Sequence, residues 1–423
     1  MNPRVRKIIM CVCAAVFIIA MVLLFLNMSG VPLSNVHYIF RPEPQLPERD
    51  FGEQKLTADR EAIVMTCGYD TLDDSLKDTY DTVDEFVNKS EPERFTADCS
   101  HDEFRSVMSA YRNDHPEVFW LGADGTEYHY WDYGDSIDVE YYFAFEGDEL
   151  DEMKEELSDR VEKIMAEAPE EASDYELELY FNDYLTKNIE YDTEKSGPMI
   201  RNSYGALLFG RVVCAGYSEA FQLLCNRAGI ECAEIYGYIT HTDGEGNQTE
   251  ENTLHQWNCV KIEGDWYYVD VTWNDISQMG GIMAHAYFNV TYDDLMPTRT
   301  FNPLYEDDPD REDSLFNSII PECDATEYNY YKKSCTEITD PNDDDEIIAA
   351  IIEAAKEKRT SIDFRISDKL DFRSARDEIA DKYVVQWTDA ANFYNKDDPS
   401  IERPKKLYSY DKTHCIVIDL DYK

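Results

Sequence analysis

Basic side chains are scarce in this chain of 423 residues. Lys and Arg together number 39 against 88 Asp and Glu, which gives a formal net charge of −49. Nucleic-acid affinity depends on Lys and Arg that neutralise phosphates, so this balance excludes a nucleic-acid partner. The same shortage excludes attachment to a membrane surface through a polybasic patch.

The sequence also lacks the spacing patterns of metal sites. No Cys pair has the CxxC spacing, and no His and Cys cluster has the ligand spacing of a zinc site. The acidic run 340–346 lacks the alternating oxygen ligands and the central glycine of a calcium loop. We expect no metal ion and no cofactor.

One long apolar run is present, at the N-terminus. Arg4, Arg6 and Lys7 precede an uncharged run over 8–26, which is long enough to cross a membrane as one helix. Positive charge before it predicts a cytoplasmic N-terminus, with the bulk of the chain extracytoplasmic. We expect residues 1–30 to be a single-pass anchor in the cell membrane. The alternative is a cleaved signal segment and a secreted protein.

An extracytoplasmic location determines what state we expect for the cysteines. Eleven are present, and nine lie outside the apolar run. An odd number in an extracytoplasmic chain indicates one free, reactive thiol. The pairs Cys323–Cys335 and Cys67–Cys99 are conceivable disulfides, and buried free thiols are the alternative.

The remaining chain is rich enough in apolar residues to fold, since 43% are hydrophobic and 13% aromatic. Prolines mark residues 31–59 as an extended stalk. Acidic segments at 305–314 and 340–346 favour boundaries between domains. We expect three folded units: an N-terminal α/β domain over 60–150, a domain that carries the chemistry over 151–310, and a C-terminal α/β domain over 311–423.

Cys214 is placed at the start of a predicted helix. Apolar residues after it recur with helical spacing, at Tyr217, Ala220, Phe221, Leu224 and Cys225. The free N–H groups and the dipole at a helix N-terminus stabilise a negative charge. Such a position lowers the pKa of a thiol and makes its thiolate available as a nucleophile.

A base for this thiol is offered by a predicted hairpin. Residues 254–262 and 265–273 both alternate like strands around Glu263-Gly264. A two-residue turn there makes paired positions sum to 527 and places His255 and Asp270 on one face as diagonal neighbours. A four-residue turn has the same parity, whereas a three-residue turn would place them on opposite faces. The other face then carries a buried apolar set, Val260, Ile262, Val269 and Val271.

Together, Cys214, His255 and Asp270 are the residue types that an activated cysteine nucleophile requires. Cys214 would attack a carbonyl, His255 would move the proton, and Asp270 would hold the imidazole tautomer. The backbone N–H of Cys214 is an oxyanion donor. Tyr204 and Trp257 are weaker candidates for contacts with the substrate or the oxyanion.

The motifs VVCAGYSEAFQLLCNRAGIEC and HQWNCVKIEGDWYYVDVTWND resemble the transglutaminase-like superfamily of papain-type thiol enzymes, in particular its bacterial extracytoplasmic branch. The resemblance covers about 173–295 and includes AYFNV at 286–290. It implies an α+β fold in which the cysteine helix packs on an antiparallel sheet that carries His255 and Asp270. It also implies thiol-dependent acyl transfer from an amide. Cys259 departs from the aliphatic residue usual in the family.

Three functions remain open from the sequence. A hydrolase, meaning a cysteine peptidase or amidase, is favoured because the calcium-site pattern of the animal cross-linking enzymes is missing. The alternatives are a protein-cross-linking transglutaminase and a surface scaffold with a vestigial site. The expected partner is a protein or peptide substrate at the cell surface. Residues 201–240 hold three Arg and three Glu, so the acidic excess lies elsewhere and favours basic substrates.

Overall fold

The computed structural model describes residues 67–422, apart from 90–93, 124, 196–198, 243–247, 277–281, 284, 302–320, 322, 343, 396–400, 403, 405 and 412. The chain divides into residues 1–48 and 49–423, and all described residues belong to the second unit. Within them no helix is long and apolar enough to cross a membrane. The predicted anchor over 1–30 and the stalk over 31–59 lie outside the described residues.

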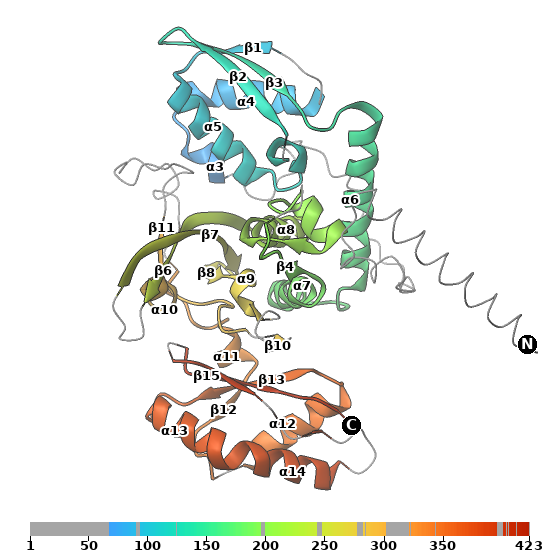
Figure 1. Ribbon diagram of the computed structural model, residues 1–423, viewed down its shortest axis with the longest axis vertical. Coiled ribbons are helices and arrows are strands. Elements are labelled where there is room, and N and C mark those ends of the chain that lie inside the picture. Colours follow the sequence, from blue (N-terminus) through green and yellow to red (C-terminus); the bar gives the residue numbers. More distant parts are fainter. Residues whose placement is uncertain are drawn as a thin grey trace, which may run out of the picture. The chain divides into compact units, whose positions relative to one another are not determined.

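The first described elements form a small three-stranded sheet with helices against it (Figure 1). The helices are α3 (Cys67–Thr71), α4 (Asp74–Lys89) and α5 (His101–Asp114). The strands are β1 (Arg94–Ala97), β2 (Glu127–Asp132) and β3 (Ile137–Tyr142), in the order β1-β3-β2. A capping box between Ser100 and Glu103 begins α5.

Two helices lead into the central part of the fold. The first is α6 (Gly147–Glu167), whose apolar stripe buries Leu150, Leu157, Val161 and Ile164. The second is α7 (Asp174–Asn188), which begins at a capping box formed by Ser173 and Glu176. A parallel pair of short strands follows, β4 (Glu190–Tyr191) and β5 (Arg211–Val212), with a π-helix at Gly205–Phe209 between them.

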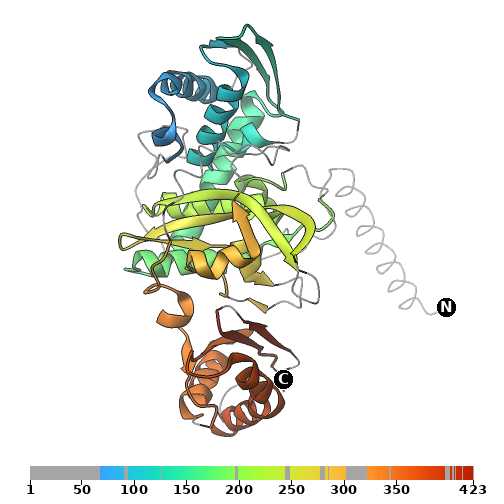
Figure 2. The ribbon, with the colours of Figure 1, turned by 90° about the vertical axis from the view of Figure 1, so that its left-hand side faces the viewer.

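The central sheet is antiparallel and has the order β11-β6-β7-β8. Its strands are β6 (Cys232–Thr242), β7 (Gln248–Ile262), β8 (Asp265–Val269) and β11 (Arg299–Phe301). The helix α8 (Cys214–Arg227) lies against β6 and β7 (Figures 1 and 2). The short elements beside the sheet are α9 (Val271–Asn274), β9 (Asp275–Ile276), β10 (Ile282–Met283), α10 (Tyr292–Leu295) and a 3-10 turn at Met296–Thr298.

The predicted hairpin has the predicted register. Ile262 pairs with Asp265, and Asn258 pairs with Val269, so both pairs sum to 527. Glu263 and Gly264 both have positive φ, 52° and 97°, as a two-residue type I′ turn requires. One face of the hairpin packs into the main core through the expected set, Val260, Ile262, Val269 and Val271.

One prediction about this hairpin is wrong. The second strand was expected to run to Trp273, but β8 ends at Val269 and a short helix follows. The Asp270 side chain accepts a hydrogen bond from the Trp273 N–H at 3.1 Å, which begins that helix. Asp270 therefore lies just beyond the strand rather than within it.

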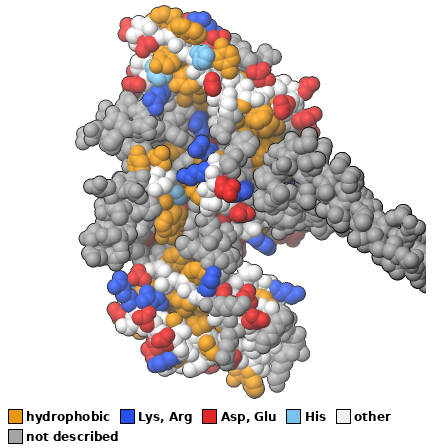
Figure 3. All heavy atoms as spheres, in the orientation of Figure 1, with side chains coloured by type: hydrophobic (Ala, Val, Ile, Leu, Met, Phe, Trp, Pro, Cys, Tyr) orange, Lys and Arg blue, Asp and Glu red, His pale blue; other side chains and the backbone are white. Residues whose placement is uncertain are grey.

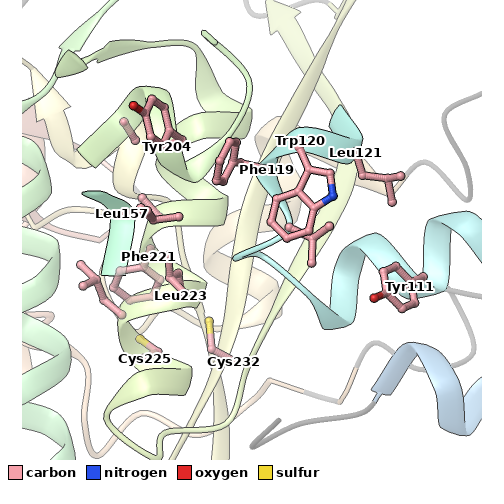
Figure 4. Close-up of a cluster of buried hydrophobic side chains, with 14 of the residues drawn as sticks. Tyr111, Phe119, Trp120, Leu121, Leu157, Tyr204, Phe221, Leu223, Cys225 and Cys232 are labelled. Atoms are coloured by element: carbon pink, nitrogen blue, oxygen red, sulfur yellow. The ribbon is translucent and has the colours of Figure 1, made fainter. Parts of the chain in front are cut away.

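The core of the central part is shared with the N-terminal elements. Phe119 and Trp120, in a 3-10 turn at Phe119–Gly122, join Phe221 and Leu223 of α8 in one buried cluster (Figure 4). Gln222 of α8 also donates to the Asn113 carbonyl at 2.6 Å. The segment after α5 is thus packed directly on the helix that begins at Cys214.

The last described elements have a hydrophobic core of their own, built around Ile351, Phe364, Trp387 and Ile416. Their helices are α11 (Tyr330–Lys333), α12 (Asp345–Lys356), α13 (Phe372–Glu378) and α14 (Val384–Tyr394), with a π-helix at Ile379–Tyr383. Their strands are β12 (Thr336–Ile338), β13 (Ser361–Ile366), β14 (Leu407–Tyr410) and β15 (Cys415–Asp419), in the order β12-β13-β15-β14. The fold is thus of the α+β class, as predicted.

The described cysteines are free thiols: Cys99, Cys214, Cys225, Cys232, Cys259, Cys323, Cys335 and Cys415. The conceivable Cys323–Cys335 disulfide is therefore not formed. The side chain of Cys67 lies outside the described residues. Cys259 shares the sheet face of His255, where it is buried against Trp257 and Tyr268.

Candidate active site

Cys214 is the first residue of α8, as the sequence predicts. The preceding residue Val213 donates its N–H to the Ile200 carbonyl at 2.8 Å, which fixes the entry into the helix. Gly216 makes this turn possible, since a Cβ atom there would come within 2.6 Å of the Val212 Cβ. The Cys214 side chain is half-buried, whereas Cys225 further along α8 is fully buried. The thiol is therefore both at the positive end of the helix and reachable.

His255 and Asp270 are in direct contact. His255 Nε2 lies 2.7 Å from Asp270 Oδ2, and both side chains are buried. When this nitrogen carries the proton and donates to the carboxylate, Nδ1 is left as the acceptor. The carboxylate thus selects the tautomer of the imidazole and orients its ring.

The imidazole in turn contacts the thiol of Cys214. Burial by itself raises the pKa of Cys214, but the hydrogen bond and the charge of His255, with a hydrogen bond from the Gln256 backbone N–H, lower it below the ordinary value. Burial lowers the pKa of His255, and the contacts with Asp270 and Cys214 outweigh it and raise the pKa to about 9. These shifts favour a thiolate and an imidazolium at neutral pH.

Asp270 is held by more than the histidine. Its Oδ1 accepts from the Trp273 N–H at 3.1 Å, and its own N–H donates to the Tyr287 carbonyl at 2.9 Å. Burial raises the pKa of Asp270, but the charges of His255 and Arg299 lower it to about 2. The carboxylate is therefore ionised throughout the neutral range.

Arg299 is a member of this cluster that sequence reasoning missed. It lies at the start of β11 and is buried, and its Nε donates to Asp270 Oδ2 at 3.1 Å. Its Nη2 donates to the same oxygen. No motif or spacing connects Arg299 with Asp270, which lies 29 residues earlier, so no signal in the sequence could have found it.

The two weaker candidates lie elsewhere. The Tyr204 hydroxyl donates to Glu156 Oε2 at 2.5 Å, and its ring packs on Phe119 at a centroid distance of 4.7 Å. Trp257 is fully buried, with its ring 6.0 Å from the His255 ring. The Tyr204 hydroxyl is thus engaged with Glu156, and the Trp257 ring packs beside the His255 ring.

Another aromatic side chain lies beside the nucleophile. The half-buried ring of Tyr191 in β4 packs against Val213 and Ala215, the two neighbours of Cys214. Burial and the negative charges of Cys214 and Asp270 raise the pKa of Tyr191 to about 12. Among the described residues no group of three or more His, Cys, Asp or Glu side chains could hold a metal ion.

The central part of the chain matches a known family. Residues 160–271 match the family model described as the transglutaminase-like superfamily. This range contains Cys214, His255 and Asp270. The match confirms the resemblance that the motifs predict, while the bacterial extracytoplasmic branch stays a prediction.

Two curated relatives and two solved structures are similar to parts of the chain. Kyphoscoliosis peptidase of Mus musculus is 31% identical over 128 residues, which are 29% of this chain and 18% of that protein. The protein of the same name from Homo sapiens is 32% identical over 97 residues, 21% of this chain and 14% of that protein. The chain thus spans less than a fifth of the length of these relatives.

The solved structures share less sequence. A structure of a TGase is 14% identical, with a TM-score of 0.24, and covers 43% of this chain and 51% of its own. The periplasmic domain of TgpA from Pseudomonas aeruginosa is 15% identical, with a TM-score of 0.24, and covers 34% of this chain and 58% of its own.

Proposed function

We propose that this protein, whose residues 160–271 form a transglutaminase-like domain, is a thiol-dependent enzyme that transfers an acyl group from a protein or peptide amide. The observation that carries the proposal is the chain of contacts from Cys214 to His255 and from His255 to Asp270. The three groups suit the three roles: a thiol at a helix N-terminus as nucleophile, a titratable ring for proton transfer and a buried carboxylate that orients the ring.

In the proposed reaction the Cys214 thiolate attacks the amide carbonyl carbon, and the carbonyl electron pair moves to oxygen. The backbone N–H of Cys214, the first residue of α8, can stabilise that oxyanion. When the intermediate collapses, the C–N bond breaks and the His255 imidazolium gives its proton to the leaving amine. A thioester on Cys214 and a free amine result.

The second half of the reaction depends on the acceptor. A water molecule or an amine attacks the thioester carbonyl, His255 takes its proton, and the Cys214 thiolate leaves. Water gives hydrolysis and a lysine side chain gives a cross-link. We place hydrolysis first, because the sequence lacks the calcium-loop pattern of animal cross-linking enzymes and because the curated relatives are named peptidases.

One experiment separates these reactions. The full chain is incubated with a library of peptides, with and without a dansyl amine, and the products are analysed by mass spectrometry. We expect cleaved or deamidated peptides and no dansylated product at low amine concentration. Dansylated peptides at low amine would instead assign the protein as a transglutaminase. No turnover of any peptide in either arm would favour the scaffold with a vestigial site.

The proposed substrates are basic proteins outside the cell. The apolar run over 8–26 supports an extracytoplasmic location, and the net charge of −49 attracts cationic chains. Lys and Arg side chains stand among acidic ones on the face in Figure 3, so the acidic excess of the described residues does not form one continuous patch there.

A further inference from the structure

A buried guanidinium, that of Arg299, contacts the same carboxylate of Asp270 that His255 contacts. Arg299 is 2% exposed, and among the described residues it is the one Lys or Arg that is buried as a whole residue. Removing such a charge from water is costly unless it is paired with good geometry. Its presence beside Asp270 therefore calls for a role that an apolar side chain could not fill.

Arg299 is held in place by groups other than the carboxylate. Its Nη1 donates to Thr298 Oγ1 at 2.7 Å. The guanidinium lies over the rings of Trp273 and Tyr287, 4.6 Å from each centroid. Its backbone is fixed because Arg299 pairs with Ile239 of β6. These contacts fix the position of the guanidinium independently of Asp270 and of any substrate.

The contacts of Asp270 leave it little freedom. Oδ2 accepts from His255 Nε2 and from both Nε and Nη2 of Arg299, while Oδ1 accepts from the Trp273 N–H. These donors take up the acceptor directions of the carboxylate and prevent its rotation. The angle at which Asp270 meets the imidazole is therefore set in part by Arg299.

We propose that Arg299 is a positioning residue for the acyl-transfer reaction, which fixes Asp270 against His255 and balances the charge of the carboxylate. This inference rests on the proposed function of Cys214 and His255. It adds a fourth charge to the site, so that thiolate, imidazolium, carboxylate and guanidinium alternate in sign and sum to zero.

The charge balance matters for proton transfer. Without the positive charge of Arg299, the Asp270 carboxylate would stabilise the imidazolium of His255 more strongly. The ring would then give up its proton less readily to the leaving amine. Loss of the guanidinium should therefore raise the pKa of His255, and of Cys214 and Asp270 as well. The other titratable groups that face this cluster are Tyr191, Tyr287 and Glu234, and burial raises the pKa of each of them.

The test compares three variants of the full chain. Arg299→Met removes the charge, Arg299→Lys keeps the charge but loses the planar fork, and Arg227→Met is the matched control. Arg227 makes a partly buried two-point contact with Glu162 from the other end of α8, with N–O distances of 2.7 and 3.0 Å. The readouts are kcat, KM, the pH profile of kcat/KM and the melting temperature.

We expect Arg299→Met to lower kcat by about 10–100-fold, with little change in KM. This is the scale found when a hydrogen-bond partner that orients a metal-binding side chain is removed. Both limbs of its pH profile should move upward by about one unit. Arg299→Lys should keep the limbs in place and recover part of kcat. Arg227→Met should lower the melting temperature and leave the profile where it is.

Two results would overturn the inference. The first is an Arg299→Met protein that melts lower, as Arg227→Met does, but keeps the wild-type kcat and pH profile. The second is an equal loss in Arg299→Lys and Arg299→Met with unmoved limbs. If the wild type turns over no amide, the proposed function fails, and the pH dependence of Cys214 alkylation by iodoacetamide still decides the role of Arg299. An upward shift of that dependence in Arg299→Met supports the role, and an unchanged one refutes it.

Discussion

Replacing Cys214 with alanine should abolish amide turnover while the fold is retained. The substitution removes the sulfur that we propose forms the thioester, and in a serine-protease triad loss of the nucleophile costs on the order of 10⁶ in kcat. Alanine suits the first turn of α8, and the half-buried thiol leaves no large cavity. The measurement is kcat on the best peptide from the library, with circular dichroism and melting temperature as the record of folding.

Cys225→Ala is the matched control for this variant. Cys225 lies on the same helix but is fully buried and has no imidazole beside it. Burial raises the pKa of its thiol, so this sulfur stays protonated. Its removal should lower stability slightly and leave turnover intact. Turnover that persists in Cys214→Ala would exclude Cys214 as the nucleophile.

Replacing Asp270 with asparagine should have the second largest effect, and it should act on both activity and stability. An amide in this place can stabilise the wrong imidazole tautomer, which in a serine-protease triad lowers kcat by about 10⁴. The substitution also leaves the buried Arg299 without its counter-charge. Breaking a buried ion pair from one side costs about 3–5 kcal/mol in the free energy of unfolding.

A double variant separates the two consequences. In Asp270→Asn/Arg299→Met the unpaired guanidinium is gone, so stability in urea should recover in part, while turnover stays low because the histidine is still unsupported. Recovery of turnover in the double variant would contradict the role given to Asp270.

The pH dependence of stability gives an independent check on the same pair. The pKa of Asp270 is lowered from 3.8 to about 2 by its partners. The ionised Asp270 carboxylate therefore stabilises the folded state fully above about pH 4, and this stabilisation is lost as the pH falls toward 2. The contribution should be missing in Asp270→Asn.

The geometry of the hairpin could be predicted because it depends on local rules. Glu263-Gly264 fits a two-residue turn, and the turn fixes the register of every pair up to Asn258 and Val269. The helix that begins at Cys214 could be predicted for the same reason, since the spacing of its apolar residues is a local feature.

The end of the second strand could not be read in the same way. Residues 265–273 alternate to their end, yet Asp270 accepts a hydrogen bond from the Trp273 N–H and begins a helix. An aspartate can lie within a strand or cap a helix. Here its position depends on contacts with distant parts of the chain, namely the Tyr287 carbonyl and Arg299. Contacts of this kind have no spacing signature in the sequence.

The same reasoning explains the residues that were placed differently. Tyr204 is a candidate for contact with the substrate or the oxyanion, but its hydroxyl donates to Glu156, 48 residues away. Trp257 has the parity of His255 and shares its face, but the face is covered by a buried cluster that includes Tyr268 and Val290. Parity determines the face of a sheet, and only the packed structure determines what covers it.

The central claim is that Cys214 is a thiolate at neutral pH, and alkylation of the wild-type protein tests it most directly. The rate of reaction with iodoacetamide is followed for each cysteine by mass spectrometry as a function of pH. We predict that Cys214 reacts fastest and that its rate rises with a midpoint well below the value of about 8.5 for a free thiol. A midpoint near 8.5, with Cys214 reacting no faster than Cys225, would contradict the account.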